Sequence, residues 1–343
     1  STNIEQPGFQ RQIHRQTSEL QANGTAENPV YFTSIKDDSV GGDTNGDGNA
    51  TSPSPRDWDW IKYNSGSNGT LKHTVLRYGG HKHCSWGGCT HRAILRIHSS
   101  SVQVHNCKIE KSHQGIQVKE SAPLIQNTEV ADNQRWGINL QNSDINLQGN
   151  ILRNNGGQGI NLDSCNNATV THNTVKQNGD AGIYFRSGEG SVFNNQVKNN
   201  SGVGIYFRSS TAEARDNEIV GNQHGLRLED SAVDVAQNKI ADNSGYGLQV
   251  GIGSSESRIR ADNIIQGNGH QNNIGLIGDT LDSEAEWGEF NLTDLDMVAT
   301  GELHVGGGGS LTLGPGTVLK FRARRRAISS PPRSTVIAPG PGS

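Results

Sequence analysis

A repeat of about 22 residues runs through the middle of this 343-residue chain. Its first marker is a glycine followed by isoleucine or leucine, which recurs at steps of 21 to 23 residues at Gly115, Gly137, Gly159, Gly182, Gly204, Gly225 and Gly247. Its second marker is an asparagine, at steps of 21 to 25 residues, at Asn106, Asn127, Asn150, Asn173, Asn195, Asn217, Asn238 and Asn263. Because two independent markers keep one period, the chain is an array of one small structural unit.

Each repeat predicts three short β-strands separated by tight corners. Apolar and polar residues alternate between the corners, and no stretch within a unit has the length or period of a helix. Units of this kind bury a core only by stacking on their neighbours, which predicts an all-β parallel solenoid. We expect glycine and asparagine to supply corners with positive φ. We also expect the asparagine file to form a buried hydrogen-bonded ladder, with His73 in the same file.

A longer motif outside the repeat carries a resemblance. Residues 24–38 read Gly-Thr-Ala-Glu-Asn-Pro-Val-Tyr-Phe-Thr-Ser-Ile-Lys-Asp-Asp, and Gly-Gly-Asp-Thr-Asn-Gly-Asp-Gly follows at 41–48 and Arg-Asp-Trp at 56–58. Leu-Lys-His-Thr-Val-Leu-Arg-Tyr-Gly-Gly at 71–80 belongs to the same pattern. Over roughly residues 20–320 the chain resembles the right-handed parallel β-helices of the pectate-lyase-like superfamily, and most of all those of bacterial secreted and surface proteins. The resemblance implies a right-handed single-stranded parallel β-helix of about ten coils.

The period also divides the chain into segments. Residues 1–20 are polar and patternless, and we expect a cap or a disordered segment there. Residues 21–275 are expected to form the β-helix, with loop insertions at 37–56 and 81–92. We expect a C-terminal cap and strands at 276–321 and a disordered basic, proline-rich tail at 322–343. The resemblance implies that the Gly-Thr-Val-Leu-Lys-Phe strand at 316–321 makes head-to-tail contact with a following module.

Charge and hydropathy exclude two classes of partner. The net charge of −4 gives no electrostatic basis for binding nucleic acid. No apolar run reaches the roughly 18 residues that a membrane span needs, so we expect no membrane insertion. The four cysteines are compatible with secretion. Together with the resemblance, these features predict a secreted or cell-surface protein whose partner is a polysaccharide.

The first insertion contains a calcium-loop pattern. In Asp43-x-Asn45-x-Asp47-Gly48-Asn49, oxygen ligands fall at the positions that calcium loops use, and the glycine stands where the chain turns. We predict a structural Ca²⁺ site with ligands Asp43, Asn45, Asp47 and Asn49. The glutamate expected at position 12 is replaced by Ser54, so one more carboxylate is needed, from Asp37, Asp38 or Asp57. The alternative is a solvated turn without a metal.

The second insertion concentrates histidine and cysteine. Cys84 and Cys89 could close a small disulfide loop that displays Trp86 for stacking on a sugar. Alternatively, these cysteines and the three histidines could hold a second metal, zinc or copper, at His81, His83 and His91. The disulfide is the favoured interpretation. Cys107 and Cys165 are expected to be free and buried.

One outward face of the predicted solenoid gathers tyrosine, arginine and carboxylate side chains in adjacent coils. The residues that we predict to bind substrate are Asn139, Asn161, Tyr184, Tyr206, Arg227 and Lys119, besides Trp86. The candidate catalytic residues are Asp163, Arg186, Arg208 and Glu229, with Glu189 at the next corner. Arg186 and Arg208 lie side by side, flanked by Asp163 and Glu229, and their like charges favour an anionic ligand such as a uronate. A solvated charged face is the alternative.

Three functions fit these residues. The first is an enzyme that cleaves polysaccharide, either a lyase using arginine or a glycoside hydrolase using two carboxylates about 5–10 Å apart. Asp163 and Glu229 are three coils apart, about 14 Å, which is too far for hydrolysis unless Glu189, Glu120 or Asp230 supplies a nearer partner. The second is a non-catalytic carbohydrate-binding or adhesive module, and the third is a structural spacer. The Asp-Pro-His-Glu motif of alginate epimerases is absent. The tyrosine, arginine and carboxylate cluster tips the prediction towards a carbohydrate-active protein.

Overall fold

The computed structural model describes residues 12–15, 19–81, 83–85, 88–90, 92–254, 257–270, 274–278, 280–281, 284–287, 297–313, 318–321, 328–329 and 335–337. The chain divides into two compact units, Ser1–Gly157 and Gln158–Ser343. In the described residues all regular structure is β-strand, and no helix there has the length and apolar character needed to cross a membrane.

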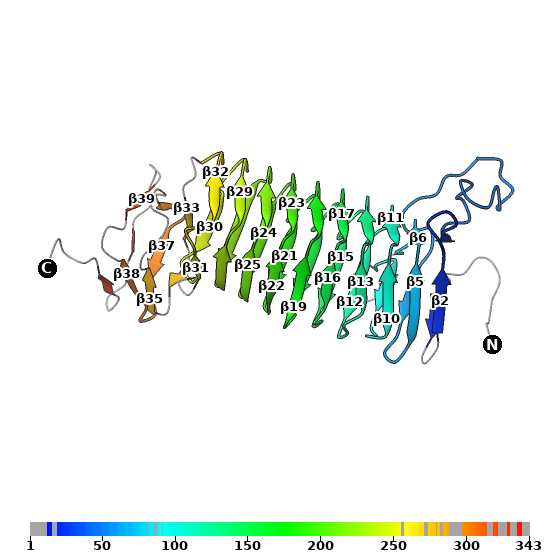
Figure 1. Ribbon diagram of the computed structural model, residues 1–343, viewed down its shortest axis with the longest axis horizontal. Coiled ribbons are helices and arrows are strands. Elements are labelled where there is room, and N and C mark those ends of the chain that lie inside the picture. Colours follow the sequence, from blue (N-terminus) through cyan, green and yellow to red (C-terminus); the bar gives the residue numbers. More distant parts are fainter. Residues whose placement is uncertain are drawn as a thin grey trace. The chain divides into compact units, whose positions relative to one another are not determined.

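Unit 1 contains three parallel sheets, each receiving one strand from every coil (Figure 1). The first sheet consists of β1 (Gln12–Arg15), β4 (Trp60–Tyr63), β9 (Leu95–Ile97), β12 (Ile116–Lys119) and β15 (Ile138–Gln141). The second consists of β2 (Glu19–Asn23), β5 (Asn68–Lys72), β10 (Val102–His105), β13 (Leu124–Gln126) and β16 (Asn146–Gln148). The third consists of β3 (Val30–Phe32), β6 (Thr74–Arg77), β11 (Lys108–Glu110), β14 (Glu129–Ala131) and β17 (Ile151–Arg153).

Unit 2 repeats this arrangement with its own strands. Its first sheet consists of β18 (Ile160–Asp163), β21 (Ile183–Arg186), β24 (Val203–Arg208), β27 (His224–Glu229), β30 (Leu248–Gly251), β33 (Ile274–Ile277), β36 (Met297–Ala299) and β39 (Leu319–Phe321). The second consists of β19 (Ala168–Thr171), β22 (Glu189–Phe193), β25 (Thr211–Arg215), β28 (Ala232–Ala236) and β31 (Arg258–Ile259). The third consists of β20 (Thr174–Lys176), β23 (Gln196–Lys198), β26 (Glu218–Val220), β29 (Lys239–Ala241) and β32 (Ile264–Gln266).

Both units are therefore parallel β-solenoids with about 22 residues per coil, which confirms the predicted fold class. The inward files are fully buried, as at Ile183, Ile205 and Leu226. Phe185 and Phe207 occupy the adjacent inward file of neighbouring coils, with ring centroids 5.8 Å apart. Stacking like on like fills the core because successive strands bring equivalent side chains to the same depth.

Asparagine ladders support the corners, as predicted. In unit 2 the backbone N–H and the side-chain amide of Asn195 both donate to Oδ1 of Asn217, at 3.0 Å each. Asn217 repeats these two bonds to Asn238. These side chains are at most 2% exposed, so the ladder satisfies backbone groups that water does not reach. A second ladder, not predicted, runs five residues further on, through Asn178, Asn200, Asn222, Asn243 and Asn268.

Two details of the predicted corners were wrong. In unit 1 the ladder passes through Cys107 and Thr128, each one residue after the predicted Asn106 and Asn127, because Asn106 and Asn127, like His73, adopt positive φ; it then reaches Asn150, as predicted. The repeated glycine before each inward isoleucine does not supply positive φ either. A Cβ on Gly204 would lie 2.5 Å from Cγ2 of Ile219, so that position needs glycine because another strand packs against its backbone.

Strands also lie near both ends of the chain, where strands were expected only within residues 276–321. Residues 12–15, within the expected cap or disordered segment, form β1 beside β4. β36 (Met297–Ala299) and β39 (Leu319–Phe321) continue the first sheet of unit 2. Short sheets also join β34 (Thr280–Leu281), β37 (Leu303–Val305) and β40 (Ile328–Ser329), and β35 (Glu284–Trp287), β38 (Ser310–Leu313) and β41 (Thr335–Ile337). The five residues of β40 and β41 are thus strands, where a disordered tail was expected.

Candidate functional site

The outward side of the first sheet in unit 2 carries the clustered tyrosine, arginine and carboxylate residues. Strands β18, β21, β24 and β27 lie in register, so outward residues form two files. The first file is Asn161, Tyr184, Tyr206 and Arg227, and the second is Asp163, Arg186, Arg208 and Glu229. We call these eight residues the tyrosine–arginine face. Its files follow from the alternation of the strands, whose inward residues are fully buried.

The first file is a stack of flat side chains. The rings of Tyr184 and Tyr206 have centroids 4.8 Å apart and are tilted by 31°. The guanidinium carbon of Arg227 lies 5.0 Å from the ring centroid of Tyr206, a cation–π contact. All three side chains are partly exposed. The result is a continuous strip of aromatic and guanidinium surface that crosses three coils.

The second file pairs each arginine with a carboxylate. Arg186 Nε lies 3.6 Å from Asp163 Oδ1, and Arg208 Nε lies 4.0 Å from Glu229 Oε1. Glu229 also accepts a hydrogen bond from Arg227 Nη2 at 2.9 Å and another from the hydroxyl of Tyr206. Charge on this face is therefore largely compensated by the face itself.

These contacts fix the protonation of the face. Burial, and then the hydrogen bond to Glu229, raise the pKa of Tyr206 well above its usual value. The hydrogen bond with Tyr184, and then the charge of Glu229, raise the pKa of Arg208. Neither group gives up its proton near neutral pH, so neither is placed to act as a general base. What the face offers is hydrogen-bond donors, one well-anchored carboxylate and a stacking surface.

The other predicted site residues lie elsewhere. Asn139 is on β15 of unit 1 and is 2% exposed, and Lys119 is on β12, with its ammonium 3.2 Å from the carboxylate of Glu120. Glu189 is exposed on β22, in the second sheet of unit 2, so it does not share the sheet of Asp163 and Glu229. Trp86 lies outside the described residues.

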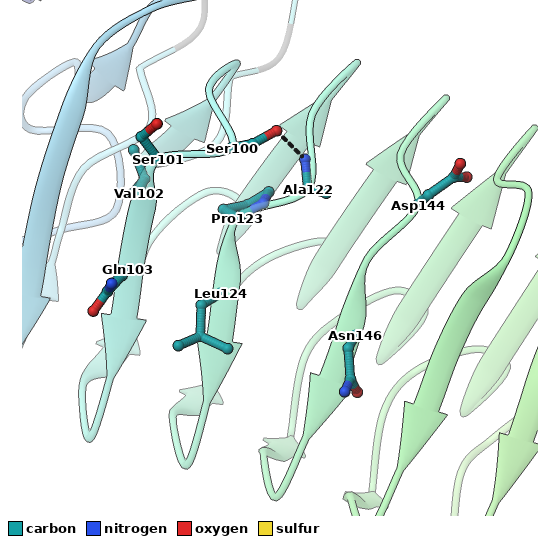
Figure 2. A pocket seen from close by; sticks show the side chains of 9 residues that line it. All are labelled: Ser100, Ser101, Val102, Gln103, Ala122, Pro123, Leu124, Asp144 and Asn146. Atoms are coloured by element: carbon teal, nitrogen blue, oxygen red, sulfur yellow. Dashed lines mark hydrogen bonds between the residues drawn. The ribbon is translucent and has the colours of Figure 1, made fainter.

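Two shallow hollows lie on second-sheet surfaces, and neither was predicted. One, of about 420 Å³, lies in unit 2 and is lined in part by Glu189, Ser191 and Glu213. The other, of about 250 Å³, lies in unit 1 (Figure 2) between Ser100, Gln103, Leu124, Asp144 and Asn146.

The acidic loop brings three carboxylates together. Oxygen atoms of Asp38, Asp43 and Asp47 all lie within 4.8 Å of one another. Asp43 accepts the backbone N–H groups of Asp47 at 3.0 Å and Gly48 at 2.8 Å, which wraps the loop around its carboxylate. Asn45 donates its amide to Asp47 at 2.7 Å, leaving its own Oδ1 buried and without a partner in the described part of the chain. Asn49, also predicted as a ligand, is exposed and has φ of 82°.

Asp38 is the additional carboxylate that the loop pattern required. Asp37 forms an ion pair with Arg77 at 2.5 Å, and Asp57 pairs with Lys36 at 3.0 Å, so both are engaged elsewhere. Oδ1 of Asp38 is buried and has no partner among the described residues. Desolvation, and then the charges of Asp43 and Asp47, raise the pKa of Asp38. An uncompensated cluster of oxygen ligands fits a hard divalent cation such as Ca²⁺.

The second insertion is described only in part. β7 (His83–Ser85) and β8 (Gly88–Thr90) form an antiparallel hairpin in which Cys84 stands opposite Cys89 in the backbone register. The side chains of His83, Cys84 and Cys89, and His91 as a whole, lie outside the described residues, and with them both the disulfide and the second metal site. Cys107 and Cys165 are buried and form no disulfide among the described residues, as expected.

Comparison with known proteins places this architecture. The family model described as "Right handed beta helix region" matches residues 59–192 and 124–268, which together exceed half of the chain. No curated protein matches the chain. Among solved structures, a variant of the periplasmic alginate epimerase AlgG is similar with a TM-score of 0.52 at 14% identity, over 94% of this chain and 68% of that one. The A-module of the Azotobacter vinelandii mannuronan C-5 epimerase AlgE4 has a TM-score of 0.49 at 14% identity, over 93% and 83%.

The structural likeness establishes the fold, and the family match agrees with the stacked parallel coils and the asparagine ladders seen in both units. This chain belongs to the right-handed β-helix family.

Proposed function

We propose that the tyrosine–arginine face binds a polysaccharide. The observation that carries the proposal is the stack of Tyr184, Tyr206 and Arg227 at 4.8 and 5.0 Å. The apolar face of a sugar ring packs on such a surface, while sugar hydroxyls find donors and acceptors at its edge in Arg208 and Glu229. Because the strip crosses successive coils, it suits an extended chain of sugars.

Binding fits the geometry better than hydrolysis. Asp163 and Glu229 occupy the same file three coils apart, so about 14 Å separates them, beyond the range in which paired carboxylates hydrolyse a glycosidic bond. Glu189, which was to supply a nearer partner, stands on another sheet. The AlgG likeness, at 14% identity, supports the fold, so the proposal rests on the side chains.

Cleavage by β-elimination is the second candidate. The adjacent guanidinium groups of Arg186 and Arg208, one coil apart in register, favour it because they would contact the carboxylate of a uronate, while the carboxylate of Asp163 or Glu229 would take the C5 proton as the oxygen at C4 leaves. In both candidates the protein acts outside the cytoplasm, where polysaccharides of the cell surface and medium are found. A neighbour in fold is itself described as periplasmic.

A panel of purified polysaccharides in affinity gel electrophoresis tests binding. We expect Tyr184→Ala and Tyr206→Ala each to weaken retardation by the best ligand about tenfold, because each removes a stacking surface. Tyr31→Ala, at an exposed tyrosine on β3 in the third sheet of unit 1, is the control and keeps wild-type retardation. Equal retardation of all variants would contradict the proposal. Ultraviolet absorbance of unsaturated sugar ends, measured on the same panel, reports β-elimination.

We further propose that Asp38, Asp43, Asp47 and Oδ1 of Asn45 hold a structural Ca²⁺. The orphaned, buried oxygens of Asp38 and Asn45 support this assignment, because a cation would satisfy both. Its chemical contribution would be to neutralise three carboxylates and fix the 37–56 loop on unit 1. The loop, rather than the tyrosine–arginine face, is what the ion would order.

Head-to-tail contact between modules stays a proposal. β39 pairs with β36 along one edge, and no other strand of the described residues pairs with it. An unpaired strand edge is a template for a further coil. Analytical ultracentrifugation of the chain with residues 316–321 intact, against a variant with Lys320→Pro, would detect self-association through this edge, and identical sedimentation would refute it.

A further inference from the structure

Five basic side chains gather on the outward side of the first sheet in unit 1. Lys62 on β4 pairs in register with Arg96 on β9, and Arg92, His98 and Lys119 lie around them. We call Lys62, Arg92, Arg96, His98 and Lys119 the basic cluster. It belongs to a different unit from the tyrosine–arginine face.

Arg96 is the centre of the cluster and is 9% exposed. Its Nε donates to Oε1 of Gln117 at 3.1 Å, and its guanidinium carbon lies 5.6 Å from the ring centroid of Trp60. The guanidinium of Arg92 lies 5.2 Å from the same ring. These partners are all neutral. They hold the two arginines in place without compensating their charge.

Ion pairs with carboxylates do not compensate the two arginines either, among the residues that the structure describes. Within the part of the chain that the structure describes, none of Lys62, Arg92 and Arg96 forms an ion pair. Glu120 pairs with Lys119 at the rim of the cluster. The Nε of Arg92 and the Nε2 of His98 are buried and lack hydrogen-bond partners among the described residues.

Repulsion between the positive charges of the cluster also lowers the pKa values of three of its members. Burial, and then the charges of Arg96 and Arg92, lower the pKa of Lys62. Burial and Arg92 lower the pKa of Arg96 to about 10. Burial, followed by Lys62, Arg96 and Lys119, lowers the pKa of His98 to about 4. Each group is therefore harder to charge in the folded protein than in water.

Unit 2 provides the contrast. The arginines on its first sheet, Arg186, Arg208 and Arg227, each lie within 4.0 Å of a carboxylate on the same face. A buried cation without a counter-ion costs free energy that a bound anion removes. The basic cluster has the donors and the positive potential of an oxyanion site, and nothing in the described residues fills that role.

We propose that the basic cluster binds an oxyanion group of an acidic polysaccharide, either a carboxylate or a sulfate ester. The polysaccharide as the source of the oxyanion rests on the function proposed above. Binding of an oxyanion depends only on the geometry of the basic cluster. The net charge of −4 makes nucleic acid a poor alternative source of the anion. The experiment must distinguish oxyanion binding from a purely structural role, in which the arginines only cover Trp60.

Lys62→Gln is the informative variant, because it removes one charge and leaves the contacts of Arg96 with Gln117 and Trp60 intact. Lys72→Gln is the matched control. Lys72 is exposed on β5, in the second sheet of the same unit and away from the basic cluster. Because each variant replaces one lysine by glutamine, the two variants have equal net charge. The probes are dextran, carboxymethyl dextran and dextran sulfate, which share one backbone and differ only in the oxyanion. Affinity is measured by calorimetry at fixed ionic strength.

We expect the wild-type chain to bind at least one charged polymer about tenfold more tightly than dextran. Lys62→Gln should lose most of that preference, and Lys72→Gln should change it less than about twofold. Lys62→Gln should also melt at the wild-type temperature or above, because it relieves repulsion in the free protein. Preference for carboxymethyl dextran identifies a carboxylate, and preference for dextran sulfate identifies a sulfate ester.

Two results would overturn the proposal: no preference of the wild-type chain for either charged polymer, or equal losses in Lys62→Gln and Lys72→Gln. A lower melting temperature of Lys62→Gln with unchanged affinity would assign the cluster a structural role instead. Failure of the polysaccharide proposal is seen separately, as unchanged binding by Tyr184→Ala and Tyr206→Ala. The charge variant and the tyrosine variants therefore report on different claims.

Discussion

The asparagine ladder allows a stability effect to be worked out from individual bonds. The side chain of Asn217, 1% exposed, takes part in four hydrogen bonds. Its Oδ1 accepts the backbone N–H and the amide of Asn195, each at 3.0 Å. Its amide donates to the Val192 carbonyl at 2.8 Å and to Oδ1 of Asn238 at 3.0 Å. At about 1 kcal/mol net for each bond, Asn217→Ala should cost about 4 kcal/mol, and the orphaned N–H of Asn195 adds about 1 kcal/mol or more.

Urea unfolding followed by circular dichroism measures this cost, and two further variants calibrate it. Asn217→Thr should cost about half as much, because Thr128 already occupies the ladder in unit 1 and accepts the N–H of Cys107 at 3.4 Å. Asn194→Gly is the matched control: the side chain of Asn194 is exposed and its φ of 55° suits glycine, so the change should stay within about 0.5 kcal/mol. If Asn217→Ala were no more destabilising than Asn194→Gly, the ladder would not stabilise the coils as described.

Three further perturbations follow from the structure. Calcium should raise the melting temperature of the wild-type chain above its value in chelator, and Asp43→Asn should abolish the difference because it removes a central ligand. Equal melting temperatures of the wild-type chain in calcium and in chelator would refute the site. Burial and neighbouring charges lower the pKa of His98 in the folded protein to about 4, so on acidification the unfolded chain binds a proton first. Lowering the pH from about 6.5 to 4 should therefore reduce the free energy of unfolding by about 2–3 kcal/mol. His98→Gln should remove that loss in urea titrations at several pH values. A pH profile unaltered by the substitution would contradict this. Phe207→Ala should cost about 3–5 kcal/mol in the same unfolding assay, since Phe207 is fully buried against Phe185, and a cost below about 1 kcal/mol would show that the core collapses to fill the space.

The period was sufficient to predict the register of the first sheet. Once Ile183 and Ile205 were aligned, the spacing of two residues on a strand placed Tyr184 beside Tyr206 and Arg186 beside Arg208, as the structure has them. Stacking of like on like made this inference safe, because a slip of one residue would expose the whole inward file.

The corners were harder to predict, because asparagine has two roles there. Asn194 and Asn199 adopt positive φ, whereas Asn195 and Asn200, one residue later, carry the ladders. Composition does not distinguish the two positions, which explains the error of one residue at His73. A pair of asparagines five residues apart in each coil, such as Asn195 and Asn200, was the available signal for the second ladder.

The pairing of charged side chains on the two faces could not be predicted from the sequence either. Alternation predicts that Arg227 and Arg96 both point outward, but it does not predict that Arg227 reaches Glu229 while Arg96 has no carboxylate within reach in the described residues. Nor could the loop pattern choose among Asp37, Asp38 and Asp57, because the choice depends on which aspartates Arg77 and Lys36 engage.

A crystal structure of the complex with the best-binding oligosaccharide tests the central claim most directly. We expect sugar rings to lie over Tyr184 and Tyr206, with hydroxyl groups within hydrogen-bond distance of Arg208 or Glu229. An oligosaccharide bound instead in the second-sheet hollow beside Glu189 and Glu213, with the two tyrosines uncovered, would contradict it.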